Sequence, residues 1–259
     1  MKTVKDKHIW IIGASSGIGE ALAKELAARG AVLAVSARRK EALESLLTTL
    51  DGDGHIAAPL DVTKHDDIKN AMTQIKTAFP SVDSVIDLAA LYTPDDGTLQ
   101  KLSDIHKVLD VNIGGIFNVI DVVRPFFEKQ GYGQLVLCGS VAGYTGLTRG
   151  QPYSATKAAI MNLAQSLHVD LEPYQIDVKL ISPGFVDTPL TEKNTFKMPM
   201  IIDADEAARA IANGVVQSRF EIHFPKRFTF CMKLLRMMPY WLYFRLMRKA
   251  RDSAASDSV

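Results

Sequence analysis

Short apolar runs alternate with longer amphipathic segments along most of the chain. The runs are rich in Val, Ile and Leu and show little alternation with polar residues, which is typical of parallel strands covered on both faces. They occupy residues 9–12, 32–37, 56–60, 82–88, 134–138, 178–182 and 221–224. The segments between them have helical spacing, as in Ile18, Leu22 and Leu26, with Gly30 as the expected stop. This rhythm predicts an α/β fold with a doubly wound parallel sheet of about seven strands.

Length and composition indicate a single domain and narrow the classes of function. A chain of 259 residues with 47% hydrophobic content can bury a substantial core, and a net charge of +1 offers no overall basic field for nucleic acid. The two cysteines, Cys138 and Cys231, suit a reducing compartment and provide neither a disulfide framework nor a metal site. The N-terminus does not read as a signal peptide, and no apolar run approaches the ~20 residues of a membrane span. We therefore expect a cytoplasmic protein without a metal ion.

A glycine-rich stretch, GASSGIG, joins the first expected strand to the first expected helix. Glycines permit a tight turn there and let the backbone approach a pyrophosphate, whose charge is stabilised by N–H groups at a helix N-terminus. An ordinary strand-to-helix turn that uses glycine for positive φ is the alternative. The residues expected to contact a dinucleotide in this loop are Gly13, Ser15, Ser16, Gly17, Ile18 and Gly19.

Two arginines follow the second expected strand, in the sequence VSARRK. A site for NAD usually carries an acidic residue about 20 residues after the glycine loop to bind the ribose 2′-hydroxyl, whereas arginine can hold a 2′-phosphate. Ala37 occupies that position here and is followed by Arg38 and Arg39, so the pattern favours NADP(H). A solvated positive start to the next helix is the alternative, and Lys40 fits that alternative better.

A tyrosine and a lysine lie four residues apart in the sequence YSATK, beyond an apolar run that ends near Ser140. On a helix, Tyr153 and Lys157 would share one face, which by itself need mean nothing more than helical spacing. A chemical interpretation is that the lysine ammonium favours phenolate and lowers the tyrosine pKa from its usual ~10. Ser140 would then lie in the same cleft and hydrogen-bond the oxygen that gains charge during hydride transfer.

Together these motifs resemble the short-chain dehydrogenase/reductase family over residues 5 to 225. The resemblance rests on short motifs in the family's order: GASSGIG, LDVT with Asp61, VLDVNIGG with Asn112, Ser140, YSATK, and SPGFVDT from Ser182. It implies a Rossmann-type domain over residues 1–225 and an NADP(H)-dependent oxidoreductase that interconverts a carbonyl and a secondary alcohol. It also implies a homodimer or homotetramer, formed through the helices that carry Asn112 and Tyr153.

The resemblance assigns roles to individual residues. Tyr153 would be the general acid in reduction and the general base in oxidation, and Lys157 would also hold the nicotinamide ribose. Ser140 would orient the substrate carbonyl, and Asn112 would support a water-linked proton relay. Further cofactor contacts implied by the resemblance are Asp61, Val62, Ala89, Pro183, Gly184, Val186 and Thr188.

The sequence departs from the family pattern at two positions. The family usually has Thr before the first glycine and an Asn-Asn-Ala-Gly stretch after the fourth strand, where this chain has Ile12 and residues 87–90, Asp-Leu-Ala-Ala. One hypothesis is that Ile12 packs against Leu88, so that an apolar contact replaces a polar one.

Residues 189–201 fall where family members carry a mobile lid over the substrate. Apolar members of this segment either line a pocket for a lipophilic carbonyl compound or pack the lid onto the domain. They are Leu190, Phe196, Met198 and Met200.

Two other functions compete with the carbonyl oxidoreductase. The first is a catalytically idle nucleotide-binding or membrane-adaptor protein of the same fold, which has no reason to keep all four residues of the expected catalytic set. The second is a nucleotide-sugar epimerase, which typically has a different glycine spacing and a larger C-terminal domain than 259 residues allow.

The C-terminal extension, residues 226–259, has no counterpart in the family motifs. Residues 219–251 contain nine Lys or Arg side chains and one acid, Glu221, interleaved with large apolar residues. Pro239 is expected to divide the segment into two short helices. Basic residues beside Trp and Tyr are typical of a helix that lies on an anionic membrane. The alternative is that the apolar side covers the substrate cleft or a dimer partner.

Overall fold

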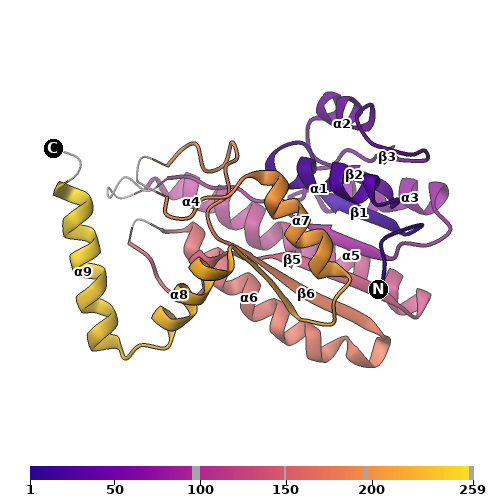
Figure 1. The fold of residues 1–259 in the computed structure, drawn as a ribbon. Coiled ribbons are helices and arrows are strands. Elements are labelled where there is room, and N and C mark those ends of the chain that lie inside the picture. Colours follow the sequence, from indigo (N-terminus) through magenta and orange to yellow (C-terminus); the bar gives the residue numbers. More distant parts are fainter. Residues whose placement is uncertain (95–99, 149, 195–197, 257–259) are drawn as a thin grey trace.

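A computed structural model of the chain describes residues 1–94, 100–148, 150–194 and 198–256, the last five of these by their backbone alone. Within these residues, seven parallel strands form one sheet in the order β3-β2-β1-β4-β5-β6-β7 (Figure 1). The strands are β1 (His8–Ile12), β2 (Val32–Ser36), β3 (Ile56–Ala57), β4 (Ser84–Asp87), β5 (Gly133–Cys138), β6 (Ile176–Pro183) and β7 (Glu221–Phe224). The predicted doubly wound α/β fold is confirmed.

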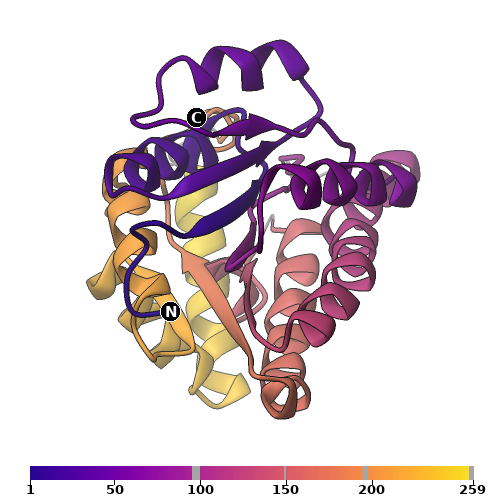
Figure 2. The same ribbon diagram turned by 90° about the vertical axis from the view of Figure 1, so that its right-hand side faces the viewer.

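Helices cover both faces of the sheet, as Figure 2 shows. One layer contains α1 (Gly17–Ala28), α2 (Lys40–Leu47) and α7 (Ala204–Val215). The other contains α3 (His65–Ala78), α5 (Gly115–Gln130) and α6 (Tyr153–Asp170). The chain also forms α4 (Leu102–Leu109), α8 (Lys226–Arg236) and α9 (Tyr240–Ser256), with short 3-10 turns at Val141–Gly143 and Glu172–Tyr174.

Each strand supplies side chains to two apolar cores, one on each face. In β1, Ile9 and Ile11 pack on the side of α1 and α7, whereas Trp10 and Ile12 pack on the side of α3 and α5. Burial on both faces explains why the strands are almost continuously apolar. The edge strand β3 is shorter than the expected residues 56–60, since it pairs with β2 over only two residues, Ile56 and Ala57.

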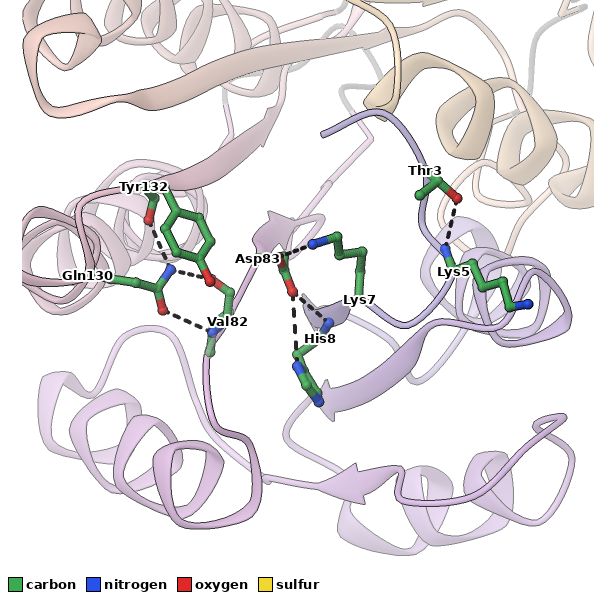
Figure 3. Close-up of polar contacts among 8 residues, drawn as sticks. All are labelled: Thr3, Lys5, Lys7, His8, Val82, Asp83, Gln130 and Tyr132. Atoms are coloured by element: carbon green, nitrogen blue, oxygen red, sulfur yellow. Dashed lines mark hydrogen bonds and ion pairs between the residues drawn. The ribbon is translucent and has the colours of Figure 1, made fainter.

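A cluster of polar side chains lies at the amino-terminal edge of the sheet, the side at which the parallel strands begin (Figure 3). The carboxylate of Asp83, which precedes β4, accepts a hydrogen bond from the backbone N–H of His8 at 3.0 Å. It also forms an ion pair with the ammonium group of Lys7 at 2.9 Å. Nearby, the Gln130 side chain bonds both backbone groups of Val82 and the carbonyl of Tyr132. The cluster ties the starts of β1, β4 and β5 together.

The C-terminal helices lie at the opposite end of the molecule from the N-terminus (Figure 1). The predicted division at Pro239 is confirmed, because α8 ends at Arg236 and the carbonyl of Pro239 accepts the first N–H bonds of α9. On their inner side, Thr229, Met232 and Tyr243 are buried. No helix in the described part of the chain is long and apolar enough to cross a membrane.

Candidate active site

A cavity of about 560 Å³ opens at the carboxyl ends of the strands. It lies where β1 and β4 are neighbours at the centre of the sheet. After β1 the chain continues to β2 on one side of this pair, and after β4 it continues to β5 on the other side. This is the position at which open parallel sheets bind ligands, and the volume is that of a small-molecule site.

The first side of the cavity is the glycine loop, whose shape requires glycine. Gly13 has φ +88°, and a Cβ atom there would lie 2.8 Å from the backbone nitrogen of Ala89. A Cβ on Gly19 would lie 2.1 Å from the carbonyl oxygen of Gly13. Gly17 has φ +57° and faces Thr188 from the loop after β6. The loop is therefore a backbone cradle rather than an ordinary turn.

This cradle fits the diphosphate of a dinucleotide. Helix α1 begins at Gly17, so its first N–H groups face the cavity with the positive end of the helix dipole. The hydroxyl-bearing residues Ser15 and Ser16 line the same space. A Cβ atom on Gly13 or Gly17 would crowd the segments after β4 and β6, so glycine lets these segments pack close to the loop.

Arg38 and Arg39 stand exposed beside the cradle and line the cavity. Arg39 donates a hydrogen bond from Nη2 to the carbonyl oxygen of Ser15 at 3.1 Å. Burial raises the pKa of Asp61, but hydrogen bonds from Thr63 and the charge of Arg38 together hold that pKa below its usual value. The two guanidinium groups therefore bring positive charge to the adenosine side of the cavity.

Tyr153 and Lys157 meet at the other end of the cavity. Helix α6 begins at Tyr153, and the ammonium nitrogen of Lys157 lies 5.4 Å from the centre of the tyrosine ring. Lys157 is 1% exposed and donates to the carbonyl oxygen of Cys138 at 2.8 Å, where β5 ends. Strand β5 thus fixes the position of the ammonium group next to the phenol.

The protonation of this pair is set mainly by burial. Burial raises the pKa of the Tyr153 hydroxyl well above its usual value, the charge of Cys138 adds to the rise, and a hydrogen bond with Ser140 opposes it. Burial also lowers the pKa of Lys157, against smaller opposing effects of Cys138 and Asp87. The expectation that Lys157 leaves the tyrosine with a lowered pKa is wrong for this structure, because burial of the phenol dominates its pKa. The Tyr153 hydroxyl is therefore protonated in this structure.

Ser140 follows β5 and caps the 3-10 turn after it. Its Oγ accepts a hydrogen bond from the N–H of Ala142 at 3.1 Å, so the backbone turn orients the hydroxyl. The residue is 8% exposed and lines the cavity with Tyr153. A substrate oxygen between the two side chains would meet two hydroxyl groups.

Asn112 lies behind the cavity rather than on its wall. It sits in a π-helical bulge, Asp110–Gly114, between α4 and α5, a deformation often found at functional sites. Its side chain accepts from the N–H of Leu91 at 2.7 Å and donates to the Leu91 carbonyl and to the hydroxyl of Thr156, each at 3.0 Å. These bonds join the segment after β4 to helix α6.

Asp87 is a buried acid behind the cavity that the sequence flagged only as a departure from the family pattern. It is 2% exposed, and its carboxylate accepts one hydrogen bond from the N–H of Ala89 at 3.0 Å. Burial raises the pKa of Asp87 to about 6, against that bond and the charge of Lys157.

The proposed packing of Ile12 on Leu88 does not occur. Ile12 pairs in register with Asp87, so these two side chains point to the same face of the sheet. Leu88 packs in the core on the opposite face, and only its backbone N–H bonds the Ile12 carbonyl, at 2.9 Å. Side chains alternate along a strand, so the residue after Asp87 faces away from Ile12.

The segment after β6 closes one side of the cavity. Thr191 accepts from the N–H of Thr188 and donates to the carbonyl of Val186, which folds this segment over the glycine loop. Leu190 lines the cavity, whereas Met200 is exposed and Phe196 lies outside the described residues. Met198 is half-buried, and its sulfur accepts a hydrogen bond from Asn194.

An aromatic contact connects this segment to the tyrosine of the site. The Tyr92 ring meets the Tyr153 ring edge-on at 5.1 Å between centres, and its hydroxyl donates to Asn194 at 2.7 Å. Nothing in the sequence pattern indicated Tyr92, because the contact depends on how distant loops meet.

All but one of the residues expected at the site line this cavity, the exception being Asn112. The lining contains Gly13, Ser15, Ser16, Gly17, Ile18, Gly19, Arg38, Arg39, Asp61, Val62, Ala89, Ser140, Tyr153, Lys157, Pro183, Gly184, Val186 and Thr188. Lining residues that the sequence did not indicate include Leu60, Leu91, Val111, Cys138, Thr191 and Lys193.

Comparisons with known proteins agree with this geometry. The model of the short chain dehydrogenase family matches residues 7–198. An uncharacterized oxidoreductase of Staphylococcus epidermidis is 32% identical over 217 residues, which cover 84% of this chain and 94% of that protein. One of Myxococcus xanthus is 30% identical over 243 residues, which cover 93% and 96% of the two chains.

Solved structures show the same fold. A short chain dehydrogenase from Burkholderia cenocepacia in complex with NADP superposes with a TM-score of 0.82 at 21% identity, covering 95% of this chain and 99% of that one. A 3-ketoacyl-(acyl-carrier-protein) reductase from Brucella melitensis complexed with NADH gives a TM-score of 0.76 at 24% identity, covering 86% and 98%.

Proposed function

The chain belongs to the short-chain dehydrogenase/reductase family of NAD(P)-dependent oxidoreductases, and we propose that it uses NADP(H) to interconvert a carbonyl and a secondary alcohol. The observation that carries the proposal is the meeting of Tyr153, Lys157 and Ser140 in the cavity that also holds the glycine cradle. An idle nucleotide-binding protein would not need a proton donor in this position.

Tyr153 provides the proton in this proposal. The nicotinamide, when bound, supplies or accepts the hydride. In reduction, the neutral phenol donates its proton to the substrate oxygen as negative charge develops there, and in oxidation the phenolate takes the proton back. Ser140 hydrogen-bonds the same oxygen and favours the charge that forms on it. Lys157 holds the nicotinamide ribose and favours the phenolate each time the proton leaves, while Asn112 supports a water-linked proton relay.

The cofactor preference is proposed to depend on Arg38. Its guanidinium lies near Asp61 on the adenosine side, where a 2′-phosphate would place its charge. Arg39 already bonds the Ser15 carbonyl, so it supports the loop and adds charge from a fixed position. Solved relatives of similar fold are described with NADP, NAD or NADH, so fold alone does not decide the preference.

The substrate is proposed to be lipophilic. The cavity that contains Tyr153 is also lined by the apolar residues Leu91, Val111 and Leu190. These apolar walls surround the hydroxyl groups of Tyr153 and Ser140. They favour a substrate with apolar groups on both sides of its carbonyl, since binding removes that apolar surface from water.

The remaining proposals concern location and assembly. We propose a cytoplasmic protein that forms homodimers or homotetramers through α5 and α6, where Phe117 and Val169 leave apolar surface exposed. Contact of residues 226–251 with an anionic membrane is a separate proposal, because it depends on the C-terminal helices and not on the catalytic cavity.

A panel of ketones, aldehydes and secondary alcohols, each supplied with NADPH or NADP⁺ and with NADH or NAD⁺, tests the proposed function. Turnover is followed by the absorbance of the reduced nicotinamide. We expect activity on apolar members of the panel and a lower Kd for NADPH than for NADH by direct titration. Binding of NADPH without turnover of any carbonyl or alcohol would favour the idle alternative.

A further inference from the structure

Large apolar side chains are exposed to solvent around the turn between α8 and α9. Met237, Tyr240 and Trp241 are 80%, 78% and 69% exposed, and they follow one another across the turn. Phe230 and Leu234 extend this surface along α8, since residues four apart share a helix face. We refer to these five residues and Phe244 as the apolar tip. Apolar patches of this kind mark interaction sites.

The inner side of the same helices is already used for packing. Met232 belongs to the main core and Thr229 is buried. Lys233 forms an ion pair with Glu221 at 2.6 Å, and the Tyr243 hydroxyl donates to the carbonyl of Gly146. These contacts fix the inner side against the body, so the apolar tip does not cover the catalytic cavity.

The charges beside the apolar tip identify its partner. Residues 222–251 contain basic side chains and no Asp or Glu. Arg227 and Arg236 on α8 and Arg245, Arg248 and Lys249 on α9 are exposed. A second copy of the chain placed symmetrically on this surface would bring like charges together, which disfavours a dimer here. Anionic lipid headgroups complement the charge, and the apolar tip complements the acyl boundary beneath them.

We propose that the apolar tip docks on an anionic membrane, with Trp241 and Tyr240 at the level of the headgroups and the flanking arginines on the lipid phosphates. Tyr and Trp favour this depth because their rings combine an apolar body with a polar atom. The helices lie on the membrane and do not span it.

The docking surface is attached to the loop that carries Ser140. Tyr144 donates to Glu221, the residue that pairs with Lys233 of α8, and Gly146 accepts from Tyr243 of α9. The segment between Ser140 and Tyr153 is therefore held by both C-terminal helices. A docked membrane would lie on the same side of the molecule as this segment, where a lipophilic substrate could leave the bilayer.

Co-sedimentation of the full-length protein with vesicles tests the proposal, and it does not depend on catalytic activity. Vesicles of phosphatidylcholine with phosphatidylglycerol are compared with phosphatidylcholine alone, at low and high salt. We expect binding to the anionic vesicles, weaker binding to the neutral ones, and loss at high salt.

Variants separate the apolar and basic contributions. We expect Trp241→Ser, and the double variant Arg245→Gln with Arg248→Gln, to weaken binding by roughly tenfold or more. The matched controls are Tyr174→Ser, an exposed aromatic residue, and Lys69→Gln, an exposed lysine on α3; both should bind like the unchanged protein. Retained NADPH binding shows that each variant is folded.

Three results would overturn the proposal. The first is that the unchanged protein stays in the supernatant with anionic vesicles at low salt. The second is that Trp241→Ser binds as well as Tyr174→Ser. The third is that Trp241→Ser converts an oligomer into monomers in light scattering while vesicle binding is absent, which would assign the apolar tip to a second copy.

Discussion

The amino-terminal and carboxyl-terminal edges of the central sheet, where the parallel strands begin and end, carry polar side chains with different roles. At the amino-terminal edge, Asp83 bonds Lys7 and His8, so its charge and the backbone groups beside it are satisfied within the protein (Figure 3). At the carboxyl-terminal edge, Tyr153 and Ser140 line the cavity. Burial there shifts the pKa of Tyr153 upward, whereas the Asp83 carboxylate at the amino-terminal edge is bonded to its neighbours in the chain.

The comparison shows how one sheet separates stability from chemistry. The polar groups at the amino edge hold strands together, because their hydrogen bonds are complete in the folded state. Those at the carboxyl edge have bonding capacity left for a substrate. Substitutions at the amino edge should therefore change stability with little effect on turnover, and substitutions of the hydroxyl groups that line the cavity at the carboxyl edge should do the reverse.

The largest effect is expected from Tyr153→Phe. Removing the hydroxyl deletes proton transfer while the ring still fills its space, so turnover should fall by about 10²- to 10⁴-fold with cofactor affinity nearly unchanged. Steady-state kinetics and NADPH titration measure both quantities. Tyr132→Phe at the amino edge is the control and should be as active as the unchanged protein. Near-normal turnover of Tyr153→Phe would contradict the assignment of catalysis to the carboxyl edge.

A smaller effect is expected from Arg38→Ala. A hydrogen bond to a charged group contributes about 1.5 to 3 kcal/mol, so NADPH affinity should fall by roughly ten- to a hundredfold and NADH affinity little. Titrating each cofactor into the protein measures this, with Lys40→Ala as the neighbouring control. If both cofactors lose affinity equally, Arg38 does not read the 2′-phosphate.

At the amino edge, Asp83→Ala should lower stability and spare activity. The substitution leaves the N–H of His8 and the ammonium of Lys7 without their acceptor, at a cost of about 1 to 3 kcal/mol. The expected fall in Tm is about 2 to 4 °C for each kcal/mol. Asp66→Ala on the exposed start of α3 is the control and should change Tm little. A loss of turnover with unchanged Tm would contradict the division of roles.

The smallest effect is a pH dependence of stability that arises from Asp87. Its pKa is about 6 in the folded protein, above the usual value of 3.8, so the folded state binds the proton more tightly than the unfolded state does. This contribution therefore stabilises the protein as the pH falls from 7 to 5, on the order of 1 kcal/mol. Asp87→Asn should lack this gain. Denaturant unfolding of both proteins at the two pH values measures the difference, and parallel changes would show that Asp87 does not titrate in this range.

The sequence predicted those parts of the site that depend on local geometry. The glycine loop, the pair Tyr153 and Lys157, and Ser140 were recognisable because each is a short motif next to an expected strand or helix. Glycine is required at Gly19 by a close approach within the loop itself, to the carbonyl of Gly13, whereas the requirement at Gly13 arises from the backbone of Ala89 and became visible only in the fold.

Other features depended on contacts between distant segments and were missed or wrong. The packing of Ile12 with Leu88 was wrong because adjacency of two loops does not tell on which face of the sheet each side chain lies. The direction of the pKa shift of Tyr153 was wrong because burial, which dominates it, is a property of the assembled fold. The contact of Tyr92 with Tyr153 joins two loops of the folded chain.

The central claim is hydride transfer at the carboxyl edge of the sheet, and isotope transfer tests it most directly. The protein is incubated with a ketone and NADPH that carries deuterium at the transferred position, with each face of the nicotinamide labelled in turn, and the alcohol is analysed by mass spectrometry and NMR. The account predicts a single deuterium on the carbinol carbon for one of the two labelled cofactors. Alcohol that forms without deuterium from either cofactor, or no alcohol at all with any ketone, would contradict it.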